Sequence, residues 1–187
     1  MGQVIRGGCM FMLTIWVMLT GICGILVAYG YWVKITRRFT TVEKVRAYSS
    51  ARMNSVKLKK IVRRYGIRAV VDFRRNKKEI NCERILLESL GVKYFNLQTG
   101  QVPDDKTVEK FIEIVRCAEN ISVLFHCTHG AGRTGVFMDI YRMEFMGMTN
   151  QQVIFRALWR SFFWNFRTDS KKERFLQGYV PRTGRNA

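Results

Sequence analysis

Beyond residue 34, stretches in which apolar residues have the spacing of a helix alternate with short apolar stretches typical of a strand. Within residues 55–65 the apolar positions fall three or four apart, which predicts an amphipathic helix. Ser55 is placed to cap the start of this helix, and Gly66 stands just past its end. Residues 67–73 follow with an apolar, β-branched centre, which predicts a strand.

The same alternation continues toward the C-terminus. Further elements are expected as a first strand within 40–52, a helix over 80–90, a strand over 92–97, a helix opened by Pro103, a strand over 121–125, and a helix opened by the capping box Thr149–Gln152. Helices that separate strands at this spacing are typical of βαβ units. The expected fold class is therefore α/β, with a central, mostly parallel sheet flanked by helices.

Residues 9–33 depart from this pattern, because 25 consecutive positions contain no charged residue and no histidine. As a helix, this run would extend roughly 37 Å, enough to cross a hydrocarbon core of about 30 Å. Tyr29, Tyr31 and Trp32 stand where an aromatic belt would meet lipid headgroups. A cleaved signal peptide and a buried core helix are the alternatives, but the run is longer than the apolar part of a signal peptide. We expect one transmembrane helix here.

The charges on either side of this run set its expected orientation. Arg6 is the one basic residue before it. The basic residues that follow closely are Lys34, Arg37, Arg38, Lys44 and Arg46. The positive-inside rule places residues 34–187 in the cytoplasm, with the helix in the inner membrane if the source is bacterial. Cys82, Cys117 and Cys127 are widely spaced and odd in number, which favours a reducing compartment.

Composition adds a strong positive charge to this picture. The 187 residues include 32 Lys and Arg against 14 Asp and Glu, a formal charge of +18. Hydrophobic residues make up 48%, too many for a disordered basic protein, and only 2 prolines are present, which excludes proline-rich and collagen-like chains. One folded domain with an appendage is expected.

Basic residues concentrate next to the uncharged run. Eleven Lys and Arg and a single acid, Glu43, fall between Lys34 and Arg64. A second cluster comprises Arg74, Arg75, Lys77 and Lys78. A solvated face is one interpretation, and attraction to anionic lipid headgroups, at about 1 kcal/mol per basic residue, is the other. The anionic membrane surface is an expected partner, whereas nucleic acid is not, because no motif for it is present.

One segment concentrates the chemistry of the chain. Residues 126–135, HCTHGAGRTG, follow the expected strand 121–125 and precede a run with helical spacing. A glycine-bearing loop between a strand and a helix is typical of a phosphate cradle, since backbone N–H groups and the positive helix end converge on one oxyanion. Cys127 at the base of this loop would be stabilised as a thiolate by the same donors and act as a nucleophile.

Further residues complete the expected catalytic site. Arg133 can grip two phosphoryl oxygens with its planar guanidinium group. Thr134 supplies a hydroxyl that can hydrogen-bond the sulfur and help it to leave. The phosphate is expected to lie against Thr128, His129, Gly130, Ala131, Gly132 and Arg133.

Two plainer interpretations compete with this one. Cys127 as an inert buried thiol beside ordinary loop histidines is the first. A zinc site at His126 and His129 is the second, but no third ligand stands at a suitable spacing. No metal and no cofactor are expected.

The segment also resembles a known signature. His-Cys-x-x-Gly-x-x-Arg-Thr-Gly is the signature of the cysteine-dependent protein tyrosine phosphatases, here of their dual-specificity-like branch. The resemblance extends over about residues 44–165, because 48–50, 71–74 and 91–97 look like landmarks of the family in the same order. Together with the N-terminal run, the chain resembles small bacterial membrane-anchored members. The resemblance implies a phosphotyrosine phosphatase-like fold.

The resemblance also implies a reaction in two steps, through a phosphocysteine at Cys127 and then attack by water, without a metal. It gives His126 an orienting role that tunes the thiolate, and His129 at most an influence on substrate preference.

The general acid of the first step is where the sequence departs from the family. Aligned on Pro103, the acidic residue of relatives corresponds to Thr99, which cannot donate the proton. Asp104 and Asp105 are the substitutes, although acids in the first turn of a helix also stabilise its dipole. Asp72 at a strand end is a third candidate, for which a structural role is favoured. Without a good acid, alkyl phosphates would react slowly.

These observations predict a membrane-anchored phosphatase for phosphate monoesters. The expected substrate is phosphotyrosine on a phosphorylated protein; a phosphoinositide or other phospholipid headgroup is the alternative, and a non-catalytic phosphate-binding membrane anchor is a second alternative. The aromatic residues 158–166 would form a buried helix or a membrane-contacting surface. The expected organisation is a tail 1–8, a transmembrane helix 9–33, a basic linker 34–43, a phosphatase domain 44–167 and a polar tail 168–187.

Overall fold

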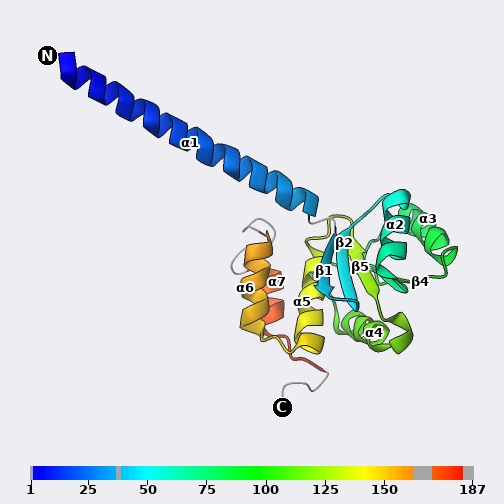
Figure 1. The fold of residues 1–187 in the computed structure, drawn as a ribbon. Coiled ribbons are helices and arrows are strands. Elements are labelled where there is room, and N and C mark those ends of the chain that lie inside the picture. Colours follow the sequence, from blue (N-terminus) through cyan, green and yellow to red (C-terminus); the bar gives the residue numbers. More distant parts are fainter. Residues whose placement is uncertain (1, 37–38, 162–169, 183–187) are drawn as a thin grey trace. The chain divides into compact units, whose positions relative to one another are not determined.

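The computed structural model describes residues 2–36, 39–161 and 170–182 (Figure 1). The chain divides into two compact units, residues 1–36 and residues 37–187. Each unit is described by itself.

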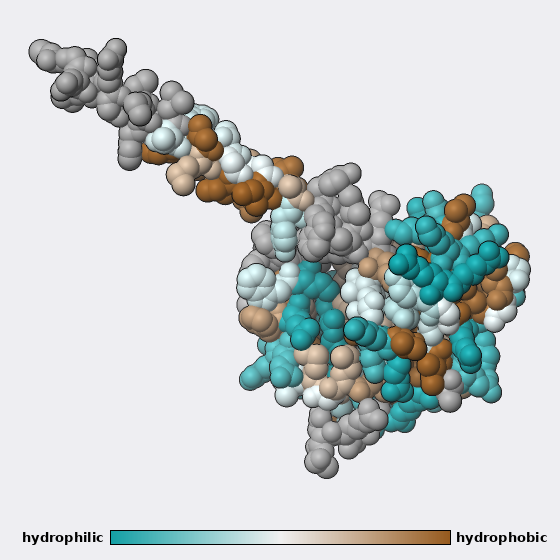
Figure 2. All heavy atoms as spheres, in the orientation of Figure 1, coloured by the Kyte–Doolittle hydropathy of each residue, from teal (hydrophilic) through white to brown (hydrophobic). Residues whose placement is uncertain are grey.

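The first unit is one continuous helix, α1 (Gly2–Thr36). Side chains are described for residues 12 and 14–30, and large apolar ones among them, such as Trp16 and Met18, are exposed. Figure 2 shows hydrophobic residues on the surface of this helix. Over the described residues, no helix combines the length and the apolar character needed to cross a membrane. The transmembrane helix expected at residues 9–33 is therefore not confirmed.

The second unit contains five strands and six α-helices among its described residues. In chain order they are β1 (Phe39–Glu43), β2 (Ala47–Ala51), α2 (Ser55–Tyr65), β3 (Ala69–Asp72), α3 (Lys77–Glu88), β4 (Lys93–Asn96), α4 (Asp105–Arg116), β5 (Val123–Cys127), α5 (Arg133–Met146), α6 (Asn150–Ser161) and α7 (Lys171–Gln177). A short 3-10 turn, Ala118–Asn120, precedes β5.

The strands form one mixed sheet in the order β1-β2-β5-β3-β4. Strands β2, β5, β3 and β4 run parallel, and β1 is antiparallel at the edge. The expected α/β class with a mostly parallel sheet is confirmed. Residues 40–52, expected as a single strand, instead form most of the hairpin of β1 and β2, because a turn falls at residues 44–46.

Side chains alternate between the two faces of this sheet, as the period of two requires. Val70 and Leu124 are paired across β3 and β5 and pack against Leu58 and Leu87 from α2 and α3. The next pair along, Val71 and Phe125, points to the opposite face.

On that opposite face the core is aromatic and is covered by α4 and α5. Phe111 of α4 meets the Phe125 ring edge-on at 5.5 Å, and Phe137 of α5 stacks on Phe73 at 4.1 Å. α5 is buried on nearly all sides. Its first turn is thus held firmly at the end of β5.

Most helix signals of the sequence are confirmed, with shifts at the starts. The cap of α2 is Asn54, whose side chain accepts from Lys57 N at 2.9 Å, rather than Ser55. Gly66 takes the expected left-handed conformation, with φ +59°. α4 starts two residues after Pro103, and the capping box that opens α6 forms in both directions between Thr149 and Gln152.

The polar tail expected at residues 168–187 is wrong for the part that is described. Residues 170–182 carry the helix α7, and Leu176 and Tyr179 are buried in the core. The Asn150 side chain donates to the carbonyls of both residues, at 2.7 and 2.8 Å. The C-terminal segment is part of the domain. Of the aromatic segment 158–166, residues 162–166 lie outside the described residues.

Candidate active site

The segment 126–135 is held at the centre of the sheet. β5 ends at Cys127 with β2 and β3 on either side, and α5 begins at Arg133. Residues 128–132 form the loop between them, here called the phosphate loop. The structure thus brings the expected nucleophile, loop and arginine together at the carboxyl end of the parallel strands, where ligands of open α/β sheets bind.

A glycine at position 130 is required by both conformation and space. Gly130 has φ +70°, and a Cβ there would lie 2.5 Å from Ala51 N. This close approach lets the Gly130 N–H donate to Cys127 Sγ at 3.3 Å. Cys127 is 3% exposed, so its sulfur lies at the base of the loop with a backbone donor aimed at it.

Arg133 and Thr134 occupy the first turn of α5, which begins earlier than the helical run that the sequence predicted after residue 135. Arg133 Nη1 donates to the carbonyl of Phe73 at 2.5 Å, so the side chain folds back over the end of β3. The Thr134 hydroxyl is buried and has no hydrogen-bond partner among the described residues, as is true of the Ser50 hydroxyl. A buried hydroxyl without a partner is suited to bonding a thiolate or a reaction intermediate.

Behind the phosphate loop lies a group of buried charged side chains, here called the buried cluster: Asp72, Arg74, Glu83 and His126. All four are at most 8% exposed. Arg74 joins the two acids, since it donates to Asp72 at 2.8–3.0 Å and to Glu83 Oε2 at 2.5 Å. The sequence suggested that Arg74 and Arg75 belong to one basic cluster on the surface. Arg74 instead lies buried between the two acids.

His126 connects the buried cluster to the nucleophile next to it. Its Nε2 lies 2.6 Å from Glu83 Oε1, close enough for an ion pair, although the angle between the groups is not that of a hydrogen bond. Its backbone oxygen accepts from Phe73 N at 3.0 Å. Position and contacts suit the orienting role that the resemblance implied for His126, which stays a prediction.

The electrostatics of the buried cluster favour ionised Asp72. Burial alone would raise the pKa of Asp72, but the hydrogen bond from Arg74, the electrostatic interaction with His126 and the hydrogen bond from Tyr94 hold it below its usual range. Burial and its hydrogen bond to Asp72 raise the pKa of Tyr94. Asp72 is thus a structural carboxylate rather than a proton donor.

Asp72, Glu83 and His126 also offer ligand atoms within 4.8 Å of one another, a spacing that a metal ion can use. Arg74 already bonds both carboxylates, so its guanidinium fills the place of the cation.

The two proposed general acids lie at the start of α4 and have other contacts. Asp104 caps the helix by accepting from Thr107 N at 2.7 Å, and this bond holds the pKa of Asp104 below its usual range. Asp105 pairs with Arg182 at 2.6 Å. The contact of Asp104 favours the helix-stabilising interpretation, because a general acid needs a raised pKa. Thr99 is buried.

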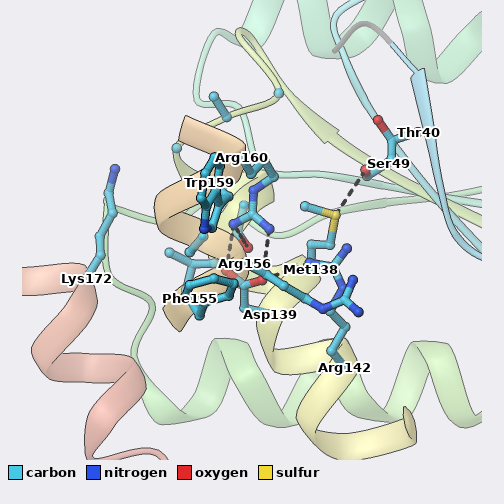
Figure 3. A pocket seen from close by; sticks show the side chains of 16 residues that line it. Thr40, Ser49, Met138, Asp139, Arg142, Phe155, Arg156, Trp159, Arg160 and Lys172 are labelled. Carbon is cyan, nitrogen blue, oxygen red and sulfur yellow. Dashed lines mark hydrogen bonds and ion pairs between the residues drawn. The ribbon is translucent and has the colours of Figure 1, made fainter. Parts of the chain in front are cut away.

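Beside the phosphate loop opens a cavity of about 340 Å³, here called the cationic cavity (Figure 3). Residues 130–132 form part of its wall. Its basic residues are Arg142 from α5, Arg156 and Arg160 from α6 and Lys172 from α7. None of the four was predicted as a site residue from the sequence, because they come from three separate helices. Lys172 fell in the expected tail.

Two side chains reach the phosphate loop from outside it. A Cβ on Gly132 would lie 3.3 Å from Gln101 Oε1 and 3.6 Å from Lys172 Nζ. Burial lowers the pKa of Lys172, and the nearby Cys127 partly offsets this effect. Lys172 is thus close enough to Cys127 for the two groups to interact electrostatically.

Comparison with known proteins points to one enzyme superfamily. A family model described as "DSP-PTPase phosphatase fused to NAD+ Kinase" matches residues 33–174. A tyrosine-protein phosphatase of Autographa californica nuclear polyhedrosis virus is 28% identical over 95 residues, 49% of this chain. The match spans 56% of that viral protein.

Solved structures agree with this assignment at the level of the fold. The catalytic core of the Saccharomyces cerevisiae protein Siw14, described as a PP-IP phosphatase, has a TM-score of 0.62 at 18% identity, covering 76% of this chain and 85% of that core. TpbA of P. aeruginosa has a TM-score of 0.58 at 25% identity, covering 72% and 81% of the two chains.

Proposed function

Because the chain belongs to the DSP-PTPase family of phosphatases found fused to NAD+ kinase and is a cysteine-dependent tyrosine/dual-specificity phosphatase, we propose that it removes phosphate from phosphotyrosine through a phosphocysteine. The phosphoryl group would lie in the phosphate loop, bound by backbone N–H groups and by Arg133. The viral tyrosine-protein phosphatase it resembles supports this substrate class.

In the first step, the Cys127 thiolate attacks phosphorus and forms an S–P bond while the P–O bond to the leaving group breaks. The phenolate oxygen that leaves takes up a proton from water. In the second step, water attacks phosphorus and gives up a proton to solvent while the S–P bond breaks, so that inorganic phosphate and the thiolate are released. Thr134 is placed to donate its hydroxyl to the departing sulfur.

The single observation that carries this proposal is the contact between Gly130 N–H and Cys127 Sγ at 3.3 Å. It supports the proposal because it aims one backbone donor of the phosphate loop at the sulfur, close to the N-terminal end of α5, where negative charge is stabilised. Arg133, held by the Phe73 carbonyl, supplies the positive charge for the phosphoryl oxygens.

The proposed substrate preference follows from the acids. With Asp104 capping α4 and Asp105 paired with Arg182, we propose that leaving groups of low basicity react fastest, since they need the least help from a proton donor.

The experiment is hydrolysis of p-nitrophenyl phosphate by the full chain in EDTA, from about pH 4.5 to 8. Cys127→Ser should abolish turnover, whereas Cys82→Ser, which changes an exposed cysteine on α3, should leave it intact. If no cysteine-dependent activity occurs at any pH, the protein is instead a phosphate-binding module without turnover.

We also propose that the protein is attached to a membrane through residues 9–33, with the phosphatase domain on the cytoplasmic side. The uncharged run and the basic residues after it support this localisation. Carbonate extraction of membranes from cells expressing the full chain tests it. Recovery of the protein in the supernatant would contradict it.

A further inference from the structure

The cationic cavity contains more positive charge than its own acid can balance. Asp139 is the one acidic residue among the described residues that line it, against the four basic residues named above. Arg160 donates to both oxygens of Asp139, at 2.9 and 2.6 Å, and Arg142 donates to one of them at 3.1 Å (Figure 3). One buried carboxylate is therefore shared by two guanidinium groups.

Arg156 has no acidic partner within ion-pair distance in the described part of the chain. Burial and the neighbouring Arg160 and Arg156 lower the pKa of Arg142, although Asp139 opposes the shift. Positive charges that crowd one another in a partly buried cavity create a favourable place for an anion.

Two of these basic residues, Arg160 and Lys172, lie next to the phosphate loop or the first turn of α5. Arg160 Nη2 donates to the carbonyl of Gly135 at 3.4 Å, in the first turn of α5, and would lie 3.2 Å from a Cβ at that glycine. Lys172 Nζ lies beside Gly132, as described above. A phosphate in the loop would therefore lie next to the cationic cavity, because residues 130–132 belong to both.

We propose that the cationic cavity binds a second phosphate group of the substrate, so that the enzyme prefers phosphate monoesters whose scaffold carries another phosphate. This inference rests on the proposed function, because the first phosphate is the one in the phosphate loop. The volume of about 340 Å³ is that of a small-ligand site. A soluble bisphosphate and a phosphorylated lipid headgroup share this chemistry.

Binding to the full-length Cys127→Ser protein tests the inference without depending on turnover. Calorimetry would compare fructose 1,6-bisphosphate with fructose 6-phosphate, and inositol 1,4-bisphosphate with inositol 4-monophosphate, two pairs that differ in phosphate spacing. We expect at least one bisphosphate to bind about tenfold tighter than its monophosphate, because charge-assisted hydrogen bonds to phosphate are strong.

Arg156→Gln in the same background should abolish most of that preference. Arg156 is exposed, so the change leaves the core untouched. Arg63→Gln on α2 is the matched control, since it removes an equally exposed arginine away from the cavity and should keep the preference. Melting temperatures of both variants show whether either fold is altered.

Two further measurements separate the possible results. Binding to phosphatidylcholine vesicles with phosphatidylinositol 4-phosphate, compared with soluble inositol 1,4-bisphosphate, tells a lipid source from a soluble one. Equal affinities for bisphosphate and monophosphate in both pairs would overturn the inference, as would an unchanged preference in Arg156→Gln. Hydrolysis of p-nitrophenyl phosphate by the unmutated chain reports on the proposed function separately.

Discussion

The buried cluster and the cationic cavity lie on either side of the same catalytic segment. They differ in the balance between their positive and negative side chains. In the buried cluster, one guanidinium from Arg74 bonds the carboxylates of Asp72 and Glu83, and positive and negative charge are matched. In the cationic cavity, Asp139 faces an excess of basic residues.

The difference separates support from recognition. Matched buried charges need no ligand, so the buried cluster can fix the end of β5 before any substrate arrives. Unmatched charges at the edge of a cavity gain most when an anion joins them. Four changes test this contrast.

The largest effect is expected from Arg74→Met. It leaves two buried carboxylates without their cation, which should lower the free energy of unfolding by about 3–5 kcal/mol. Urea denaturation measures the change, and Arg75→Met, at the exposed neighbouring position, should change it by less than about 0.5 kcal/mol. Similar losses in the two variants would show that the buried cluster does not stabilise the fold.

Asp139→Asn should destabilise the protein by less, about 2 kcal/mol, because Arg142 and Arg160 retain some contact with solvent. The variant should regain stability when pyrophosphate is added, and by a larger rise in melting temperature than the unmutated chain shows. Equal rises in both proteins would indicate that the anion does not compensate for the lost carboxylate.

The third test is pH. The pKa of Asp72 is lowered in the folded state, so its contribution to stability is complete above the unfolded value of about 3.9 and is lost as pH falls through the folded value. The free energy of unfolding should therefore fall steeply below about pH 4. Asp72→Asn should be less stable at neutral pH and should show a shallower fall. An identical slope would contradict the assignment.

The smallest effects are expected from the exposed acids of α4, which sharpen the contrast with buried carboxylates. Asp104→Asn keeps a capping side chain and should leave the melting temperature within about 2 °C. Asp105→Asn loses an exposed ion pair, of small effect. Both should hydrolyse p-nitrophenyl phosphate almost as the unmutated chain does, and loss of the acidic limb of the pH profile in either would identify the general acid.

The sequence predicted the phosphate loop well because that part of the site is local. Strand, loop, cysteine and arginine fall within the eleven consecutive residues 123–133, and the backbone alone brings them together. The parallel strands were predictable for a similar reason, since their apolar centres are short and bounded by glycine or polar residues.

The surroundings of the loop could not be read in the same way. Glu83 and His126 are 43 positions apart, and their contact depends on how α3 packs against the sheet. A linear run made Arg74 look like part of a basic surface. Its spacing of two from Asp72, which puts both side chains on the same side of an extended segment, was the signal available.

The C-terminal segment was missed because its apolar signal is brief. α7 has seven residues, of which only Phe175 and Leu176 are hydrophobic. Its burial depends on tertiary bonds, such as that from the Tyr179 hydroxyl to Glu144 on α5. Lys172 consequently reaches the phosphate loop from a region that composition alone describes as polar.

The hydrogen bond from Arg133 to the Phe73 carbonyl also affects the entropy cost of binding phosphate. An arginine that is free in solution loses about 2 kcal/mol of rotamer entropy when a ligand immobilises it. Here folding has already imposed that loss, so the guanidinium is preorganised when phosphate arrives. Association should therefore proceed as a rigid docking step, and a larger share of the contact energy is retained as affinity.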